Sequence, residues 1–142
     1  MKLVDVNILI YAVNQRSEHH AKVLTWWNDA ISGDEVVGLP WLAISGFVRI
    51  TTNPRLLDQP LTLVEAIEQV DIWLREPNVR TVPESDRHWL LFRDLLQQAG
   101  SGGNRTTDAH LAALAVANGA TLVSCDLGFA RFPQLRWENP AA

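Results

Sequence analysis

The sequence predicts one α/β domain, a sandwich of helices around a short, mostly parallel central sheet of about four to five strands. Short apolar runs alternate with helical segments of about 10 to 15 residues, which is the pattern of βαβ units. The chain has 142 residues, of which 47% are hydrophobic and 20% are charged. This length and balance fit a single domain over residues 1–142 and exclude disorder, collagen-like repeats and coiled coil.

The predicted strands are short apolar or β-branched runs bounded by turn residues. They lie at residues 2–6, 36–39, 79–82 and 121–125, with an edge strand at 134–137. Because helical segments separate most of them along the chain, we expect the strands to run mostly parallel.

The predicted helices have apolar residues at helical spacing and capping residues at their ends. They lie at about residues 8–13, 17–33, 40–53, 62–74, 85–100 and 106–119. Thr62 and Glu65 form a capping box, and Thr106 or its neighbour is expected to cap the last helix. The spacing of apolar residues places Trp41 and Trp89 on inward faces.

Composition restricts the function classes. The net charge is −4, which disfavours the strongly basic surface of a passive nucleic-acid binder. Ten of the twelve cations are arginine, which suits local phosphate contacts, although a GC-rich genome would produce the same bias. The single cysteine excludes an internal disulfide and a cysteine-based zinc site, and it indicates a reducing, cytoplasmic setting. We expect neither a secretory leader nor a membrane-spanning segment, because no apolar stretch approaches about 20 residues.

Three aspartates fall where open parallel sheets place their active sites. Asp5 ends the first predicted strand, Asp126 follows the fourth, and Asp108 lies in the first turn of the helix between them. Asp5 interrupts a run apolar enough for the core, where an unpaired carboxylate is costly. Clustered carboxylates repel one another, and a hard cation such as Mg²⁺ relieves the repulsion. The pattern therefore favours an acidic metal site, although each aspartate could instead simply cap a helix or turn.

Other candidate motifs carry less weight. The adjacent histidines His19 and His20 point in different directions on a helix and would chelate poorly. The glycine-rich loop at 100–103 lacks the Gly-Lys-Ser/Thr ending of a phosphate-binding loop. Cys125, at the end of an apolar strand, fits a buried structural thiol.

Three blocks of sequence, at residues 3–10, 106–115 and 122–129, resemble in order the signature blocks of PIN-domain ribonucleases. More closely, the chain is similar to the VapC toxins of bacterial type II toxin–antitoxin systems, and the stretches 47–55 and 129–137 look like one branch of that family. The resemblance implies a PIN-like α/β/α sandwich. It also implies cleavage of single-stranded RNA by a metal-activated water, with Mg²⁺ or Mn²⁺ as cofactor. The implied partners are a VapB-type antitoxin and a second copy of the chain.

The resemblance assigns roles to individual residues. Asp5, Asp108 and Asp126 match the first, third and fourth acids of the family, so they are the implied catalytic and metal-binding residues. Asn7 and Thr106 match supporting polar positions. Four arginines are candidates to hold flanking RNA phosphates: Arg49, Arg55, Arg105 and Arg131.

The sequence departs from the family at one point. The second acid is expected near residue 46, where this chain has Gly46. Glu84 or Asp86 could supply the absent ligand, or three acids could suffice. The departure keeps open a non-catalytic RNA-binding module with a degenerate site. A magnesium-dependent phosphatase of small molecules is weaker, because Asn7 stands where its Asp-x-Asp motif needs a second aspartate.

Overall fold

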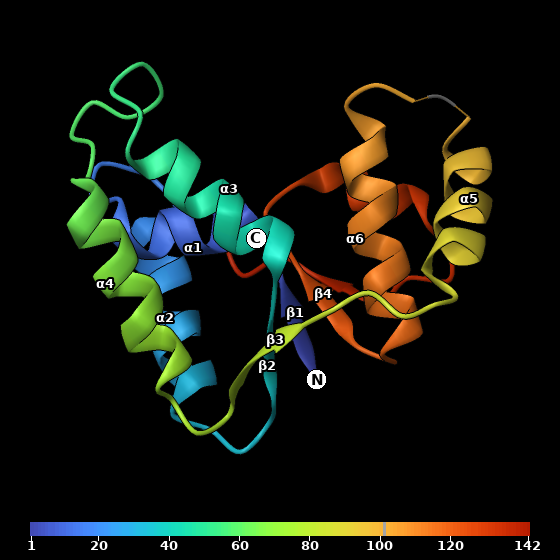
Figure 1. Ribbon diagram of the computed structural model, residues 1–142, viewed down its shortest axis with the longest axis horizontal. Coiled ribbons are helices and arrows are strands. Elements are labelled where there is room, and N and C mark those ends of the chain that lie inside the picture. The colour runs from blue at the N-terminus through green and yellow to red at the C-terminus, as the bar shows by residue number, and fades with distance from the viewer. Residues whose placement is uncertain (101) are drawn as a thin grey trace.

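The computed structural model describes residues 1–100 and 102–142, and within them the chain forms a layered α/β fold (Figure 1). A five-stranded sheet with the order β3-β2-β1-β4-β5 lies at its centre. Every pairing between neighbouring strands is parallel. The strands are β1 (Lys2–Val4), β2 (Val37–Pro40), β3 (Val79–Val82), β4 (Thr121–Val123) and β5 (Trp137–Glu138). The expected α/β fold is confirmed.

Helices cover both faces of the sheet, as Figure 1 shows. One face carries α1 (Val6–Val13), α2 (His20–Ile31), α3 (Trp41–Thr51) and α4 (Leu63–Leu74). The other carries α5 (His88–Ala99) and α6 (Arg105–Ala117), and the short 3₁₀ helix η1 (Leu127–Arg131) follows β4. The arrangement is the predicted sandwich. No helix within the described ranges is both long enough and apolar enough to cross a membrane.

Each layer of helices has its own core against the sheet. The α1–α4 side is built around an aromatic group in which Trp73 contacts Trp27 and Phe47, with ring centroids 5.2 and 5.0 Å apart. The α5–α6 side contains Phe129 and Phe132 of the η1 segment, which are 1% and 2% exposed. Since η1 is held by two buried aromatic rings, the polar residues around it have a fixed backbone.

The strand order determines where the polar residues meet. From β1 the chain continues to β2 and β3 on one side, whereas β4 and β5 lie on the other, so the order reverses between β1 and β4. Val4 is paired with Val123, which places Asp5 and Ser124 side by side at the carboxyl ends of these strands. Such a reversal point is where open α/β sheets bind ligands.

Several local expectations are corrected. Trp41 and Trp89 lie at the solvent, 52% and 59% exposed, because each is in the first turn of its helix, beyond the edge of the core. Helix α6 begins at Arg105 after Asn104, so Thr106 is an exposed residue of the first turn rather than its cap. The capping box of Thr62 and the αL stop at Gly100 are confirmed. The predicted glycine-rich loop includes residue 101, which lies outside the described residues.

Candidate active site

Asp5 is the centre of the polar cluster at the carboxyl end of β1. Its carboxylate caps α1 by accepting from the Val6 backbone N–H at 2.7 Å. The second oxygen, Oδ2, accepts from the Ser124 hydroxyl at 2.8 Å and from Asn7 Nδ2 at 3.1 Å. Capping therefore explains one oxygen of Asp5, while the other is held by one side chain from α1 and one from the end of β4.

Ser124 connects the two strand ends. Besides donating to Asp5, its Oγ accepts from Asn7 Nδ2 at 3.1 Å and from the Asp126 backbone N–H at 3.0 Å. The hydroxyl thus uses its one donor and both acceptor positions. Asn7 Oδ1 in turn accepts from the Cys125 backbone N–H at 3.1 Å. This network fixes the direction of the Asp5 carboxylate and the course of the chain towards Asp126.

The environment of Asp5 disfavours its charge. Burial raises the pKa of Asp5 from 3.8 to about 6, the Ser124 and Val6 hydrogen bonds oppose this shift, and the charges of Asp108 and Asp126 add to it. The repulsion shows that the three carboxylates share one electrostatic environment. A cation placed among them would favour the ionised form of Asp5.

Asp108 lies in the first turn of α6, where its side chain is 18% exposed. Burial raises the pKa of Asp108, the charge of Asp126 adds to this, and Arg131 and Arg105 oppose it. The guanidinium of Arg131 donates from Nη1 to Asp108 Oδ2 at 3.4 Å. One of the expected phosphate-binding arginines is therefore paired with a carboxylate of the site.

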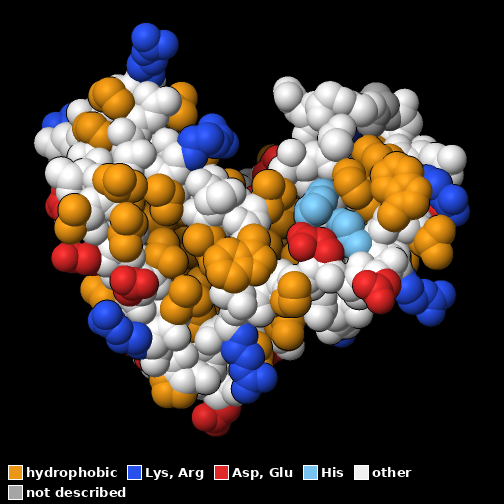
Figure 2. Space-filling model, viewed as in Figure 1, with side chains coloured by type: hydrophobic (Ala, Val, Ile, Leu, Met, Phe, Trp, Pro, Cys, Tyr) orange, Lys and Arg blue, Asp and Glu red, His pale blue; other side chains and the backbone are white. Residues whose placement is uncertain are grey.

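Asp126 begins the turn that leads into η1. Its Oδ1 accepts from the Gly128 backbone N–H at 2.8 Å, so it caps this short helix as the alternative interpretation expected. Asp126 is exposed, and its charge helps to raise the pKa of both Asp5 and Asp108. Figure 2 shows the surface hollowed between the two lobes of the molecule, with acidic atoms at the base of the notch.

The donor chemistry fits a hard divalent cation. The three carboxylates offer only oxygen atoms, and one arginine opposes them by direct contact. In the described part of the chain, no three His, Cys, Asp or Glu side chains are close enough to hold one ion by direct contact alone. Oxygen-only donors suit a hard ion such as Mg²⁺, which commonly binds through one or two carboxylates and keeps several waters.

Gly46 faces the first turn of α1. It is buried in α3, and a Cβ atom there would lie 3.1 Å from Cγ2 of Val6, the residue after Asp5. The position expected for a second acid therefore points towards the start of α1, where a methyl group of Val6 occupies the space.

The expected substitute Glu84 has a different partner. Its Oε1 lies 3.1 Å from His110 Nε2, and His110 Nδ1 lies 3.3 Å from His88 Nε2. Burial lowers the pKa of His88, and the nearby His110 lowers it further. These residues form a separate polar chain between α5 and α6, and Asp86 is an exposed residue before α5.

The remaining predicted residues lie at the surface. Arg49 in the last turn of α3, Arg55 in the following loop, and Arg105 at the start of α6 are all exposed. Thr106 is exposed beside Arg105. Ser124 is not among the predicted site residues, because its role depends on the register between β1 and β4, which the sequence does not show.

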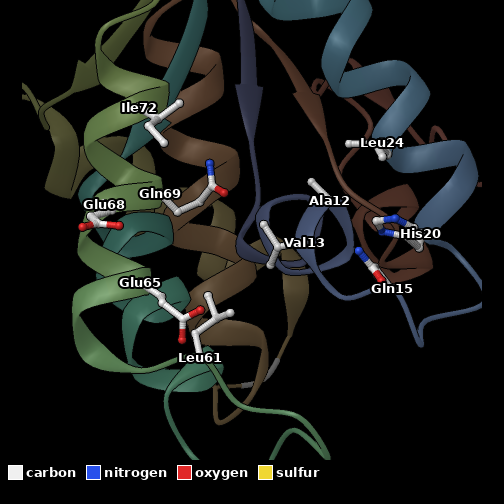
Figure 3. A pocket seen from close by; sticks show the side chains of 10 residues that line it. All are labelled: Ala12, Val13, Gln15, His20, Leu24, Leu61, Glu65, Glu68, Gln69 and Ile72. Atoms are coloured by element: carbon white, nitrogen blue, oxygen red, sulfur yellow. The ribbon is translucent and has the colours of Figure 1, made fainter.

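A second hollow lies away from the acids, with a volume of about 450 Å³. Figure 3 shows it between α4 on one side and the end of α1 and the start of α2 on the other. Leu24, Leu61 and Ile72 form apolar parts of its wall, and Glu65 and Glu68 of α4 add negative charge. We call it the α2–α4 groove.

Comparison with known proteins places these features in a family. Residues 2–135 match the PIN domain family. Ribonuclease VapC37 of Mycobacterium tuberculosis is 44% identical over 142 residues, which cover 100% of this chain and 99% of that protein. Ribonuclease VapC43 of the same species is 40% identical over 140 residues, which cover 99% of this chain and 95% of that protein.

Solved structures share the fold at low sequence identity. The VapBC2 complex from Rickettsia felis, bound to a DNA fragment from its promoter, has a chain with a TM-score of 0.72 at 19% identity, and 97% of both chains is covered. VapBC-1 from nontypeable Haemophilus influenzae has a TM-score of 0.70 at 15% identity, with 99% of this chain and 98% of that chain covered. The chain belongs to the PIN domain family and, within it, to the VapC ribonucleases.

Proposed function

We propose that the chain is the toxin of a type II toxin–antitoxin system and a Mg²⁺-dependent endoribonuclease that cleaves single-stranded RNA. Mn²⁺ is the alternative ion. One observation carries the proposal: three carboxylates, on Asp5, Asp108 and Asp126, share one electrostatic environment at the strand reversal point of a VapC-family chain. Localisation in the cytoplasm, where the RNA is, follows from this function.

The residues of the site have distinct roles in this proposal. A bound Mg²⁺ would supply an activated water and offset the charge of the phosphoryl oxygens. Asp5 and Asp108 hold the ion, directly or through water, and Asp126 is a further ligand or orients the attacking water. Ser124 and Asn7 hold Asp5 Oδ2 in place by the hydrogen bonds described above.

The substrate is held by its backbone. Arg49, Arg55 and Arg105 are exposed and provide positive charge for contacts with the phosphates of a flexible RNA strand. Because the net charge of the chain is −4, RNA is attracted only by these few local arginines. The affinity for RNA should therefore fall as salt rises, in proportion to the few phosphate contacts that they make. Thr106, exposed beside Arg105, is a supporting polar contact.

The chemistry of the products tests the proposal. Attack of water on phosphorus with loss of the 3′ oxygen leaves a 5′-phosphate and a 3′-hydroxyl, and it needs no 2′-hydroxyl. We expect the purified chain to produce 5′-phosphate ends from single-stranded RNA in Mg²⁺, with base-paired RNA resistant. A 2′,3′-cyclic phosphate product, or unchanged cleavage in EDTA, would contradict the proposal. Binding of RNA without any cleavage would favour the non-catalytic module.

We further propose that a VapB-type antitoxin binds the α2–α4 groove. The apolar wall and the two glutamates on α4 suit an apolar segment that also carries a cation. Ile72 lines the groove, whereas Ile67 on the same helix is 47% exposed but does not line it. Ile72→Asp should therefore weaken the complex with the antitoxin encoded beside this chain, and Ile67→Asp is the matched control. Equal effects of the two changes would contradict this assignment.

A second copy of the chain is the other proposed partner. Trp41 and Trp89 expose large apolar side chains. Figure 2 shows apolar groups gathered on one face of the molecule. We expect sedimentation to report a dimer at micromolar concentration and Trp41→Arg to shift it towards monomer. A wild-type monomer under these conditions would contradict homodimerisation.

A further inference from the structure

The strongest unexplained contact of the site is the pair between Arg131 and Asp108. Arg131 Nη1 lies 3.4 Å from Asp108 Oδ2, and the two side chains are only 26% and 18% exposed. An exposed arginine that waits for RNA would extend into solvent, whereas this one turns back onto a carboxylate of the proposed metal site. Its position therefore needs an explanation within the site.

The local structure holds the guanidinium over the acidic turn. Arg131 ends η1, whose neighbours Phe129 and Phe132 are buried in the core. At Gly128 a Cβ atom would lie 3.1 Å from both Arg131 Nη2 and Asp126 Oδ1. The absence of a side chain at Gly128 thus leaves room for the guanidinium beside the Asp126 turn, while its other nitrogen reaches Asp108.

The arginine and a divalent cation would use the same negative charge. Arg131 contacts Asp108 Oδ2, whereas the hydrogen-bond partners of the Asp5 carboxylate are the uncharged groups of Val6, Asn7 and Ser124. An ion that binds Asp108 must therefore compete with a guanidinium already attached to one of its oxygens, and it is also repelled by the positive charge.

We propose that Arg131 is the internal counter-cation of the acidic site: it occupies Asp108 in the metal-free protein, lowers the affinity for the divalent ion, and is released from Asp108 when the ion binds. This inference rests on the proposed function, because it presumes that the acids hold a metal. Arg131 is a positioning residue rather than a catalytic one. Release on metal binding would leave its guanidinium unpaired with Asp108 only when the site is loaded.

The test measures Mn²⁺ binding to the metal-free full chain by calorimetry, without RNA. Arg131→Gln should bind Mn²⁺ about three- to tenfold more tightly than wild type, the range expected when a half-buried competing ion pair is removed. Arg131→Lys keeps the positive charge but lacks the planar guanidinium, so its Mn²⁺ affinity should lie between those of wild type and Arg131→Gln. If Arg131 only supported the local structure, its loss would weaken Mn²⁺ binding. Tighter Mn²⁺ binding therefore distinguishes a competing cation from a purely structural residue.

Controls make the outcome specific. Arg80→Gln removes one positive charge from an exposed position on β3 that does not affect the pKa of Asp5 or Asp108, and it should leave the Mn²⁺ affinity unchanged. In a double-mutant cycle on metal-free thermal stability, Arg131→Gln should lower the melting temperature of wild type but not of Asp108→Asn.

The failures are distinguishable. Unchanged or weaker Mn²⁺ binding by Arg131→Gln, with wild type binding the ion, would overturn the inference and leave the proposed function standing. A raised KM for RNA with unaltered Mn²⁺ affinity would give Arg131 the phosphate-binding role expected from the sequence instead. Binding of Mn²⁺ by neither wild type nor any Arg131 variant would overturn both the inference and the metal site.

Discussion

Removing the charge of Asp5 should make the metal-free protein more stable at neutral pH. The pKa of Asp5 rises from 3.8 to about 6, mainly through burial, so the ionised carboxylate is unfavourable in the folded chain. A shift of about two pKa units corresponds to about 3 kcal/mol of stability. Asp5→Asn should recover part of this stability, because its amide oxygen still accepts from Val6 N–H and no charge is buried. The recovery is incomplete because the new amide NH₂ group faces Asn7 Nδ2, which is also a donor.

The sign of the effect depends on pH. Because the pKa is higher in the folded than in the unfolded chain, the folded protein binds more protons between about pH 4 and 6, and wild-type stability falls as pH rises through this window. The advantage of Asp5→Asn should therefore be present at pH 7.5 and vanish below about pH 4. Added Mg²⁺ should reverse the order at neutral pH, since the ion stabilises only the carboxylate.

Urea unfolding in EDTA and in Mg²⁺, at both pH values, provides the measurement. The exposed Asp34→Asn is the matched control for loss of one negative charge and should show no such pH dependence. Equal stability of Asp5→Asn and wild type at pH 7.5 and pH 4, or a loss of stability of the variant only at high pH, would refute the reasoning about burial of this carboxylate.

Three further changes test other parts of the structure. Gly46→Glu should add a carboxylate near the site and tighten Mn²⁺ binding measured by calorimetry. Gly46→Ala is the control for crowding against Val6, which a Cβ atom would approach at 3.1 Å. Weaker Mn²⁺ binding by the glutamate variant would contradict this prediction. Thr62→Ala removes the capping box with Glu65 and should cost about 1 kcal/mol in urea unfolding, with little change in RNA cleavage; no loss of stability would refute the assigned cap. Arg49→Gln should raise KM for RNA and reduce its salt dependence without changing kcat, and an altered kcat alone would argue against a phosphate contact.

Much of the architecture could be predicted from the sequence because the elements are locally defined. Short β-branched runs such as 79–82 and capping signals such as Thr62 act over a few residues, and the structure confirms both. The acids could be placed together because neighbouring parallel strands end at the same edge, which brings Asp5 beside Ser124. The exposure of Trp41 and Trp89 could not be predicted, since helical spacing shows which residues share a face but not where the covering layer ends.

The contacts within the site depend on tertiary structure. Ser124 becomes a hub only because the register sets it opposite Asp5, and nothing adjacent in sequence marks it. The pairing of Arg131 with Asp108 joins η1 to α6, so the sequence suggested a phosphate contact for an arginine that the fold directs to a carboxylate. Likewise, the sequence suggested Glu84 as a metal ligand, but in the folded chain Glu84 is paired with His110 of α6.

The central claim is that the acidic cluster holds the metal ion with which this chain cleaves RNA. The most direct measurement is the cleavage rate of single-stranded RNA in Mg²⁺ by wild type and by Asp108→Ala, each with and without excess EDTA, after circular dichroism has shown that the variant is folded. The account predicts cleavage by wild type in Mg²⁺ only, and none by the folded variant. Full activity of folded Asp108→Ala, or of wild type in excess EDTA, would contradict it.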